Sequence, residues 1–333
     1  MTGRPDDSAA SRLANVDEAT SAVVAGIEAG GTKFVCAIGT GPGDLRDTTS
    51  YATTSPDEAL GQAIAFIGEY QQRAGVEVAA VGVASFGPLN LHEGSPTYGH
   101  ITSTPKARWQ DTDVVTPFSD AFGVPVGVDT DVNGAALAES QWGAGRHLDP
   151  VVYVTVGTGI GGGALVNGSL LHGLMHPEMG HLPVRRHHDD RFAGVCPYHG
   201  DCLEGLASGP AIEARWQRSS RELGPELDRG VALEAWYLAQ LASTLAYVLS
   251  PELIILGGGV LKLPGLLAAV RTDTAGLLNG YLGTAVGAEQ FDRYIVAPEL
   301  GDQAGVLGGI ALAQRAVRGA DRSQMGHVPV ADP

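Results

Sequence analysis

Apolar and polar positions follow a plan that occurs twice along the chain. Residues 22–39 (AVVAGIEAGGTKFVCAIG) and 151–170 (VVYVTVGTGIGGGALVNGSL) each begin with a run rich in β-branched residues, continue into a glycine-rich turn and end in a second strand-like run. This pattern predicts a β-hairpin with a glycine tip at the start of each of two successive halves. In a dinucleotide-binding motif or a P-loop, a helix would open directly after the glycines. Strand-like segments follow them here, which excludes both motifs.

Strand-like and helical patterns alternate through the rest of the chain. Buried strands are expected at 78–87, 124–130 and 253–259, and helices at 55–75, 134–145, 231–251, 263–282 and 305–318. In the first of these helices, Ser55 is the expected N-cap, Pro56 takes the first helical position and Glu58 closes a capping box. The alternation predicts an α/β fold in three layers. The boundary between the halves is expected near 134–149, and the pattern alone would let helix 305–318 pack on either half.

Length, charge and cysteine content narrow the class of protein. The 333 residues are enough for two domains. The net charge of −16 disfavours nucleic acid or an acidic membrane as a partner, although backbone N–H groups could still bind a small phosphorylated ligand. Three cysteines without a secretory signal fit a reducing cytoplasm, where a metal site is more expected than disulfides. Cys36 is expected in the core, and the polar tails 1–20 and 319–333 are expected to be disordered.

Three glycine-rich segments could cradle phosphate groups. Glycine lets the backbone approach a ligand closely, and successive N–H groups can surround an anion. Each segment by itself could equally be only a tight turn. Two duplicated hairpin tips together with a strand-end glycine triplet favour one nucleotide clamped between two lobes. The residues concerned are Gly30, Gly31, Thr32 and Lys33, then Thr158 and Gly159, and then Gly258 and Gly259.

Two aspartates, Asp129 and Asp131, lie at the end of the expected strand 124–130 and directly after it, in the sequence DTD. Active-site carboxylates commonly lie at such strand ends in open α/β sheets, and transfer of a phosphoryl group needs a base for the acceptor hydroxyl. Either Asp129 or Asp131 could instead cap the helix that follows. One aspartate could also cap this helix while the other catalyses.

The segment CPYHGDCLEG contains three ligands of the kind that zinc prefers: Cys196, His199 and Cys202. A fourth ligand must come from elsewhere in the sequence, and from the residues alone His176 and His181 are equally good candidates among five nearby histidines. In the charged run RRHHDD, His187 and His188 are expected in a solvated loop. A closed set of four ligands would make the zinc structural rather than catalytic. The alternative is a loop with reduced thiols and no metal.

Four motifs together resemble the ROK (repressor, ORF, kinase) family of sugar kinases: GIEAGGTK, VGTGIGGG, EMGH and CPYHGDCLEG. The resemblance extends from about Val24 to about Gln314, and ITSTPKARWQDTDV, DTDVNGAALAE and CPYHGDCLEGLASGPAIEARW are most similar to the bacterial fructokinase branch. It implies two actin/hexokinase-like (ribonuclease H-like) lobes, at 21–133 and 134–304, with nucleotide and sugar bound between them. Helix 305–318 would return to the N-terminal lobe, and residues 176–205 would form a zinc loop.

The resemblance also assigns roles to residues. It implies Asp131 as the general base, with Thr130 in place of the family's usual asparagine. It implies His181 as the fourth zinc ligand. Two departures are a glutamate, Glu28, where the family has aspartate, and a C-x2-H-x2-C segment where three cysteines are usual. The sugar contacts that it implies are Thr104, Asn133, Glu178, His181 and Glu204.

Together these features predict a hexose kinase that depends on ATP and Mg²⁺ and makes fructose 6-phosphate from fructose. Mannose or glucose is the alternative substrate. The ROK family also contains sugar-sensing repressors, but these carry an N-terminal winged-helix domain, whereas about twenty polar residues precede the first expected strand here. A non-catalytic sugar binder is disfavoured because Asp131 and the glycine loops are intact. The family resemblance further implies a homodimer.

Overall fold

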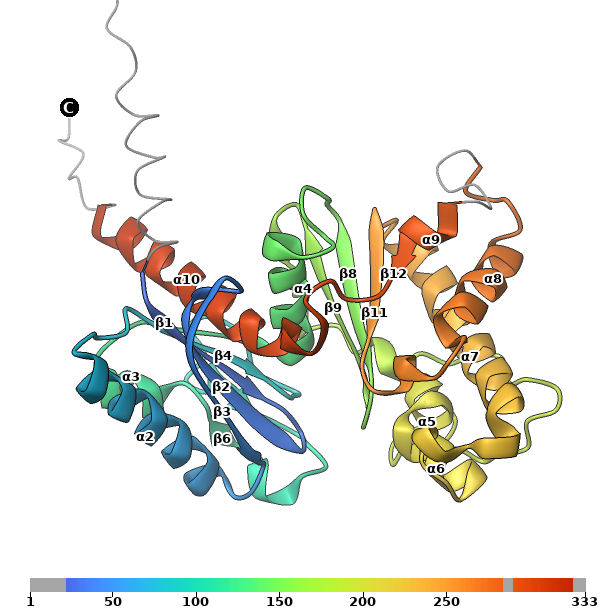
Figure 1. Cartoon of the computed structure of the whole chain (residues 1–333), viewed down its shortest axis with the longest axis horizontal. Coiled ribbons are helices and arrows are strands. Elements are labelled where there is room, and N and C mark those ends of the chain that lie inside the picture. The colour runs from blue at the N-terminus through green and yellow to red at the C-terminus, as the bar shows by residue number, and fades with distance from the viewer. Residues whose placement is uncertain (1–21, 284–289, 326–333) are drawn as a thin grey trace, which may run out of the picture. The chain divides into compact units, whose positions relative to one another are not determined.

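A computed structural model describes residues 22–283 and 290–325, so the tail at 1–20 and residues 326–333 lie outside the described part. The chain divides into two compact units (Figure 1). The first ends at Gly134 and resumes at Gly305, and the second runs from Ala135 to Ala304. Each unit contains a five-stranded mixed sheet packed against helices.

The sheet of the first unit has the strand order β3-β2-β1-β4-β7. Strands β1 and β2 form the first predicted hairpin, and β2 also pairs antiparallel with β3. Strands β1, β4 and β7 are parallel neighbours. The strands are β1 (Val24–Ala29), β2 (Lys33–Gly41), β3 (Asp44–Ala52), β4 (Val81–Ser85) and β7 (Val126–Thr130).

Helices cover both faces of this sheet, with α2 (Pro56–Ala74) and α3 (Thr116–Phe122) on one side and α10 (Ala304–Met325) on the other (Figure 1). Helix α2 begins at Pro56 as predicted, but the Ser55 side chain makes no capping hydrogen bond, so the predicted capping box is wrong. Proline already presets the first turn and removes one N–H group that would need a cap. The segment between β4 and α3 adds the short strands β5 (His100–Ile101) and β6 (Thr112–Asp113).

Helix α10 packs directly on backbone because glycine occupies the facing positions of three adjacent strands. A Cβ built on Gly26 would lie 2.5 Å from the Ile310 nitrogen, and Cβ atoms on Gly82 and Gly127 would overlap carbonyl oxygens of α10. The alternating residues of the same strands, such as Ile27 and Val83, face the core under α2. The helix runs to Met325, so residues 319–325 are helical and not the disordered tail expected there. No proline lies within residues 304–325 to interrupt the helix.

This close packing makes Gly82 a sensitive position. We expect Gly82→Ala to lower the free energy of unfolding by about 2–3 kcal/mol, because the new methyl group forces the α10 backbone away from β4. Gly61→Ala is the matched control, since a Cβ at this exposed position of α2 meets nothing within 4 Å. It should raise stability by about 0.5–1 kcal/mol through helix propensity. Urea denaturation measures both changes, and equal effects would contradict the packing described here.

The second unit repeats the plan of the first. Its sheet has the order β10-β9-β8-β11-β12, in which β8 and β9 form the second predicted hairpin and β8, β11 and β12 are parallel. The position of each strand in the sheet matches that of the corresponding strand in the first unit, although the duplicated sequence pattern predicted only the two hairpins. The strands are β8 (Val151–Val156), β9 (Ile160–Val166), β10 (Ser169–Leu170), β11 (Leu253–Gly257) and β12 (Ile295–Val296).

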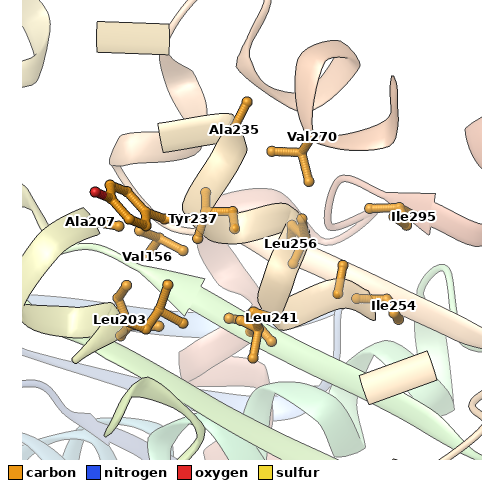
Figure 2. Close-up of a cluster of buried hydrophobic side chains, with 14 of the residues drawn as sticks. Val156, Leu203, Ala207, Ala235, Tyr237, Leu241, Ile254, Leu256, Val270 and Ile295 are labelled. Atoms are coloured by element: carbon orange, nitrogen blue, oxygen red, sulfur yellow. The ribbon is translucent and has the colours of Figure 1, made fainter. Parts of the chain in front are cut away.

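Most helices of the second unit pack on one face of its sheet, and α4 lies on the other (Figure 1). Figure 2 shows part of the core between the sheet and the larger group of helices, where Val156 and Leu256 of the sheet meet Leu203 of α5 and Tyr237 and Leu241 of α7. No described helix is long and apolar enough to cross a membrane. The helices are α4 (Asp131–Trp142), α5 (Leu203–Ala207), α6 (Gly209–Trp216), α7 (Leu227–Val248), α8 (Leu266–Leu278) and α9 (Phe291–Tyr294).

Candidate active site

The carboxyl ends of β1, β4 and β7 form one edge of the first sheet. In register, Ala29 pairs with Ser85, and Ser85 pairs with Thr130. The predicted loop 30–33 therefore leaves the sheet at the same edge as Asp131. The loop is a tight turn in which the Gly30 N–H donates to the Lys33 carbonyl at 3.0 Å. This edge thus carries both a glycine turn and a carboxylate.

The two aspartates at this edge differ in environment. Asp129 is only 2% exposed, and its Oδ1 accepts hydrogen bonds from the Thr130 N–H and the Asn133 amide, both at 2.7 Å. Asp131 is half-buried at the first residue of α4, where its Oδ1 accepts from the Val132 N–H at 2.9 Å. The Thr130 hydroxyl accepts from the Asn133 N–H at 3.2 Å, which makes Thr130 the helix cap. Asp131 is therefore the aspartate with surface available to a substrate.

Two predicted sugar contacts in the first unit are buried. Asn133 has no exposed surface and donates its amide to Asp129, so we assign it to holding that carboxylate and not to the sugar. Thr104 is 2% exposed, and its hydroxyl accepts from the Lys106 N–H at 3.4 Å. The Thr104 side chain shapes the loop that carries Lys106, and its contact with sugar stays a prediction.

Glu28 and Lys106 both lie beside elements of this edge. The Glu28 carboxylate occupies the space where a Gly305 side chain would be, close to the start of α10, where the helix dipole favours a negative charge. The longer glutamate in place of aspartate thus lies against a position that only glycine can fill. Lys106, which the sequence did not single out, has its Cε 3.4 Å from the site of a Cβ on Gly31. It brings a positive charge to the loop 30–33.

In the second unit, the two predicted glycine segments are neighbours. The glycine tip, residues 157–159, joins β8 to β9, and β8 pairs with β11 so that Thr155 lies opposite Gly257. The next residue, Gly258, has a positive φ of 93°, and a Cβ there would lie 2.6 Å from the Val156 nitrogen. Only glycine fits this conformation and this space. The two backbone segments that the sequence predicted to bind phosphate therefore lie at one edge of the second sheet.

The carboxylates of Glu178 and Glu204 lie beside this edge. Glu204 is half-buried, and its Oε2 accepts a hydrogen bond from the Ile160 N–H at 2.9 Å. Glu178 is 37% exposed and its Oε1 is 3.5 Å from His176 Nδ1. Desolvation and the nearby charge of Glu204 raise the pKa of Glu178 to about 7. Two acidic groups close enough to perturb each other are suited to accepting hydrogen bonds from neighbouring sugar hydroxyls.

Four Cys and His side chains converge in the loop between β10 and α5. His181 Nδ1 lies 3.7 Å from Cys196 Sγ and 3.6 Å from Cys202 Sγ, and His199 Nδ1 lies 3.7 Å from Cys196 Sγ. All four ligand atoms lie within 4.8 Å of one another. The edges of a tetrahedron with Zn–S and Zn–N bonds of ordinary length are about 3.6 Å between sulfur and nitrogen. This Cys/His cluster (His181, Cys196, His199 and Cys202) could therefore hold a metal ion, with His181 and not His176 as the fourth member.

A second, buried anchor of this loop is absent from the sequence predictions. Asp190 Oδ2 accepts a hydrogen bond from the Tyr237 hydroxyl at 2.7 Å and pairs with Arg215 Nη2 at 3.0 Å. The same Nη2 also donates to the Leu206 carbonyl at 2.7 Å, at the end of α5. Glu234, which is 1% exposed, lies 3.6 Å from Arg215 Nη1. These contacts tie the loop to α6 and α7 without any metal.

Glu234 provides a pH test of this anchor. Burial raises the pKa of Glu234 well above its usual range; Arg215 opposes the shift and Asp190 adds to it. Above pH about 4.3, where an unfolded glutamate ionises, the folded chain therefore holds one proton more than the unfolded chain. Its free energy of unfolding falls as pH rises, by up to about 1.4 kcal/mol per pH unit. Glu234→Gln should flatten this dependence between pH 5 and 7 in urea denaturation, and parallel profiles would contradict it.

Comparison with known proteins places this geometry in a family. The sequence profile of the ROK family matches residues 24–316. The chain belongs to the ROK family. It is 50% identical over 290 residues to a fructokinase of Zymomonas mobilis, covering 86% of this chain and 95% of that protein. It is 39% identical over 288 residues to a fructokinase of Lactococcus lactis, again covering 86% and 95%.

Solved structures agree with this ROK assignment. The ROK hexokinase from Thermus thermophilus has a TM-score of 0.72 and 28% identity, covering 89% of this chain and 99% of that one. The two-lobe actin/hexokinase-like fold predicted from the sequence is thereby confirmed. A ROK glucokinase from Streptomyces griseus, solved with glucose and AMPPNP, has a TM-score of 0.69 and 24% identity, covering 88% and 99%. The chain is thus a ROK-family sugar kinase.

Proposed function

We propose that this ROK kinase is an ATP-dependent fructokinase that converts D-fructose and ATP to D-fructose 6-phosphate and ADP. The observation that carries the proposal is its similarity to fructokinases, at 38–50% identity over at least 86% of the chain. Glucokinases of Streptomyces coelicolor and Halalkalibacterium halodurans are 28% and 27% identical to it. Fructose is therefore preferred over glucose or mannose as the proposed substrate.

In this proposal Asp131 is the general base. Its carboxylate takes the proton from the hydroxyl on C6 of fructose while that oxygen attacks the γ-phosphorus of ATP. A new P–O bond forms as the bond between the γ-phosphorus and the β–γ bridging oxygen breaks, and ADP leaves with the electron pair. The partial exposure of Asp131 and the burial of Asp129 support this choice.

The glycine segments are proposed to bind the phosphates of the Mg²⁺–ATP substrate. Backbone N–H groups at 30–33, with the exposed Thr32 hydroxyl and Lys33, suit this role in the first unit. Residues Thr158, Gly159, Gly258 and Gly259 are proposed to play it in the second. Magnesium neutralises phosphate charge when it is bound, and Glu28 is proposed to face its water shell. Lys106 adds a further charge near Gly31.

Sugar recognition is proposed for Glu178, His181 and Glu204. The two carboxylates offer acceptors for paired hydroxyls, and a half-buried acid needs such partners to offset its desolvation. His181 directs Nδ1 to the Cys/His cluster, which leaves its Nε2 for the sugar. We propose that the cluster binds one structural zinc ion, which would perform no chemistry but would hold His181 in place. The homodimer that the family implies stays a prediction.

A coupled assay that follows ADP formation tests the function directly. We would supply Mg²⁺–ATP with fructose, mannose, glucose or N-acetylated hexosamines and compare kcat/KM. Fructose should give the highest value. If another hexose gave a higher value, that hexose would replace fructose as the proposed substrate. If no hexose were turned over although fructose still bound, the result would favour a non-catalytic sugar binder.

A further inference from the structure

The peptide backbone of Ile160 is held from two sides by the segments that carry the sugar-binding carboxylates. Its N–H donates to Glu204 Oε2 at 2.9 Å, from α5. Its carbonyl oxygen occupies the place that a side chain on Gly180 would take. Gly180 lies in the short 3-10 helix Met179–His181, directly after Glu178. Ile160 is therefore in contact with both sugar-side segments and is itself the first residue of β9.

Ile160 directly follows the glycine tip, residues 157–159, so the position of its backbone also constrains the position of the tip. Within the tip, the Gly157 N–H donates to the Gly159 carbonyl at 2.8 Å. A Cβ on Gly159 would lie 2.6 Å from Glu204 Oε2, so the carboxylate packs directly under the tip. On the other side, the Gly157 carbonyl accepts from the Gly209 N–H of α6 at 2.7 Å. The orientation of the tip thus depends on an acceptor oxygen of the Glu204 side chain.

The elements that hold Ile160 are themselves closely packed. The residues on either side of Glu204 along the inner face of α5, Leu203 and Ala207, are fully buried in the core of the second unit (Figure 2). On the other side, Met179 packs where a Gly162 side chain would be. The Glu204 carboxylate therefore has little freedom to move unless the Ile160 peptide moves with it.

We propose that Glu204 is a positioning residue for the nucleotide as well as a sugar contact, because it holds the glycine tip in the orientation that binds phosphate. The inference rests on the proposed kinase function. Oε2 accepts from the Ile160 N–H, which leaves Oε1 for the sugar, so one carboxylate would connect the two substrate sites within the second unit. Loss of Glu204 then weakens nucleotide binding even when no sugar is present, whereas a pure sugar contact would not.

The test measures the affinity of Mg²⁺–AMPPNP without sugar, by titration calorimetry, and the affinity of fructose without nucleotide. We expect Glu204→Ala to weaken AMPPNP binding at least about fivefold. Glu204→Gln, whose amide oxygen can still accept from Ile160, should stay within about twofold of wild type. The matched control is Glu178→Ala, which removes the neighbouring carboxylate that has no bond to Ile160. Glu178→Ala should weaken the binding of fructose but not that of AMPPNP.

A second variant tests the inference in case Glu204→Ala does not fold. Gly180→Ala pushes on the Ile160 carbonyl from the opposite side and removes no polar group, so it should also weaken AMPPNP binding. A folded Glu204→Ala or Gly180→Ala protein with wild-type AMPPNP affinity would overturn the inference. Failure of the proposed function gives a different result, since the wild-type chain itself would then bind no AMPPNP.

Discussion

Asp131→Asn should lower kcat by about 10²–10⁴-fold, the usual contribution of a general base. The amide cannot take the proton from the attacking hydroxyl. It keeps the size of the carboxylate, and its oxygen can still accept from the Val132 N–H, as Asp131 Oδ1 does at 2.9 Å. Thr130, not Asp131, caps α4, so the helix start should not change. The coupled assay gives kcat, and calorimetry with fructose should show an affinity within about twofold of wild type.

Asp129→Asn is the matched control for this experiment. Asp129 accepts two hydrogen bonds in a buried site, and asparagine there would put an N–H donor where the carboxylate has an acceptor oxygen. We expect a loss of about 1–3 kcal/mol in the free energy of unfolding and a smaller effect on kcat than from Asp131→Asn. The opposite result, turnover lost in Asp129→Asn but kept in Asp131→Asn, would transfer the role of base to Asp129.

The features that sequence reasoning predicted best depend on local pattern and on the order of strands. The duplicated hairpin motif predicts the β1–β2 and β8–β9 pairs because β-branched runs around glycine favour a hairpin. Asp131 could be placed at a sheet edge because it follows a buried strand, and parallel neighbours end at the same edge. The C-x2-H-x2-C spacing indicates a metal site because three ligands lie close along the chain.

The features that it missed depend on contacts between distant residues. Glu204 and Ile160 are separated by 44 positions, and nothing in either segment specifies their hydrogen bond. The buried pairing of Asp190 with Arg215 spans 25 positions in the same way. Asn133 has an amide side chain of the kind that contacts sugars. Its burial, with the amide directed toward Asp129, arises only when α4 packs. Even the choice of His181 over His176 needed either the family resemblance or three-dimensional distances.

Cys202→Ser should release the zinc ion proposed for the Cys/His cluster and lower both stability and fructose affinity. Serine is a poor zinc ligand, and structural zinc sites contribute directly to folding free energy. We expect a loss of several kcal/mol, on the order of 3–5, rather than the full binding energy of zinc, because Asp190 and Arg215 anchor the same loop independently. Fructose affinity should fall at least about tenfold, since Cys202 directly precedes the helix that carries Glu204.

The third cysteine of the chain supplies the control. Cys36 is 1% exposed in β2 and lies outside the cluster, and burial raises the pKa of its thiol to about 11. Cys36→Ser should therefore keep one zinc per chain by elemental analysis and bind fructose as the wild type does. A wild-type protein without zinc would refute the metal site itself. Loss of zinc from Cys202→Ser with unchanged fructose affinity would instead show that the metal stabilises the loop but does not position Glu178, His181 and Glu204.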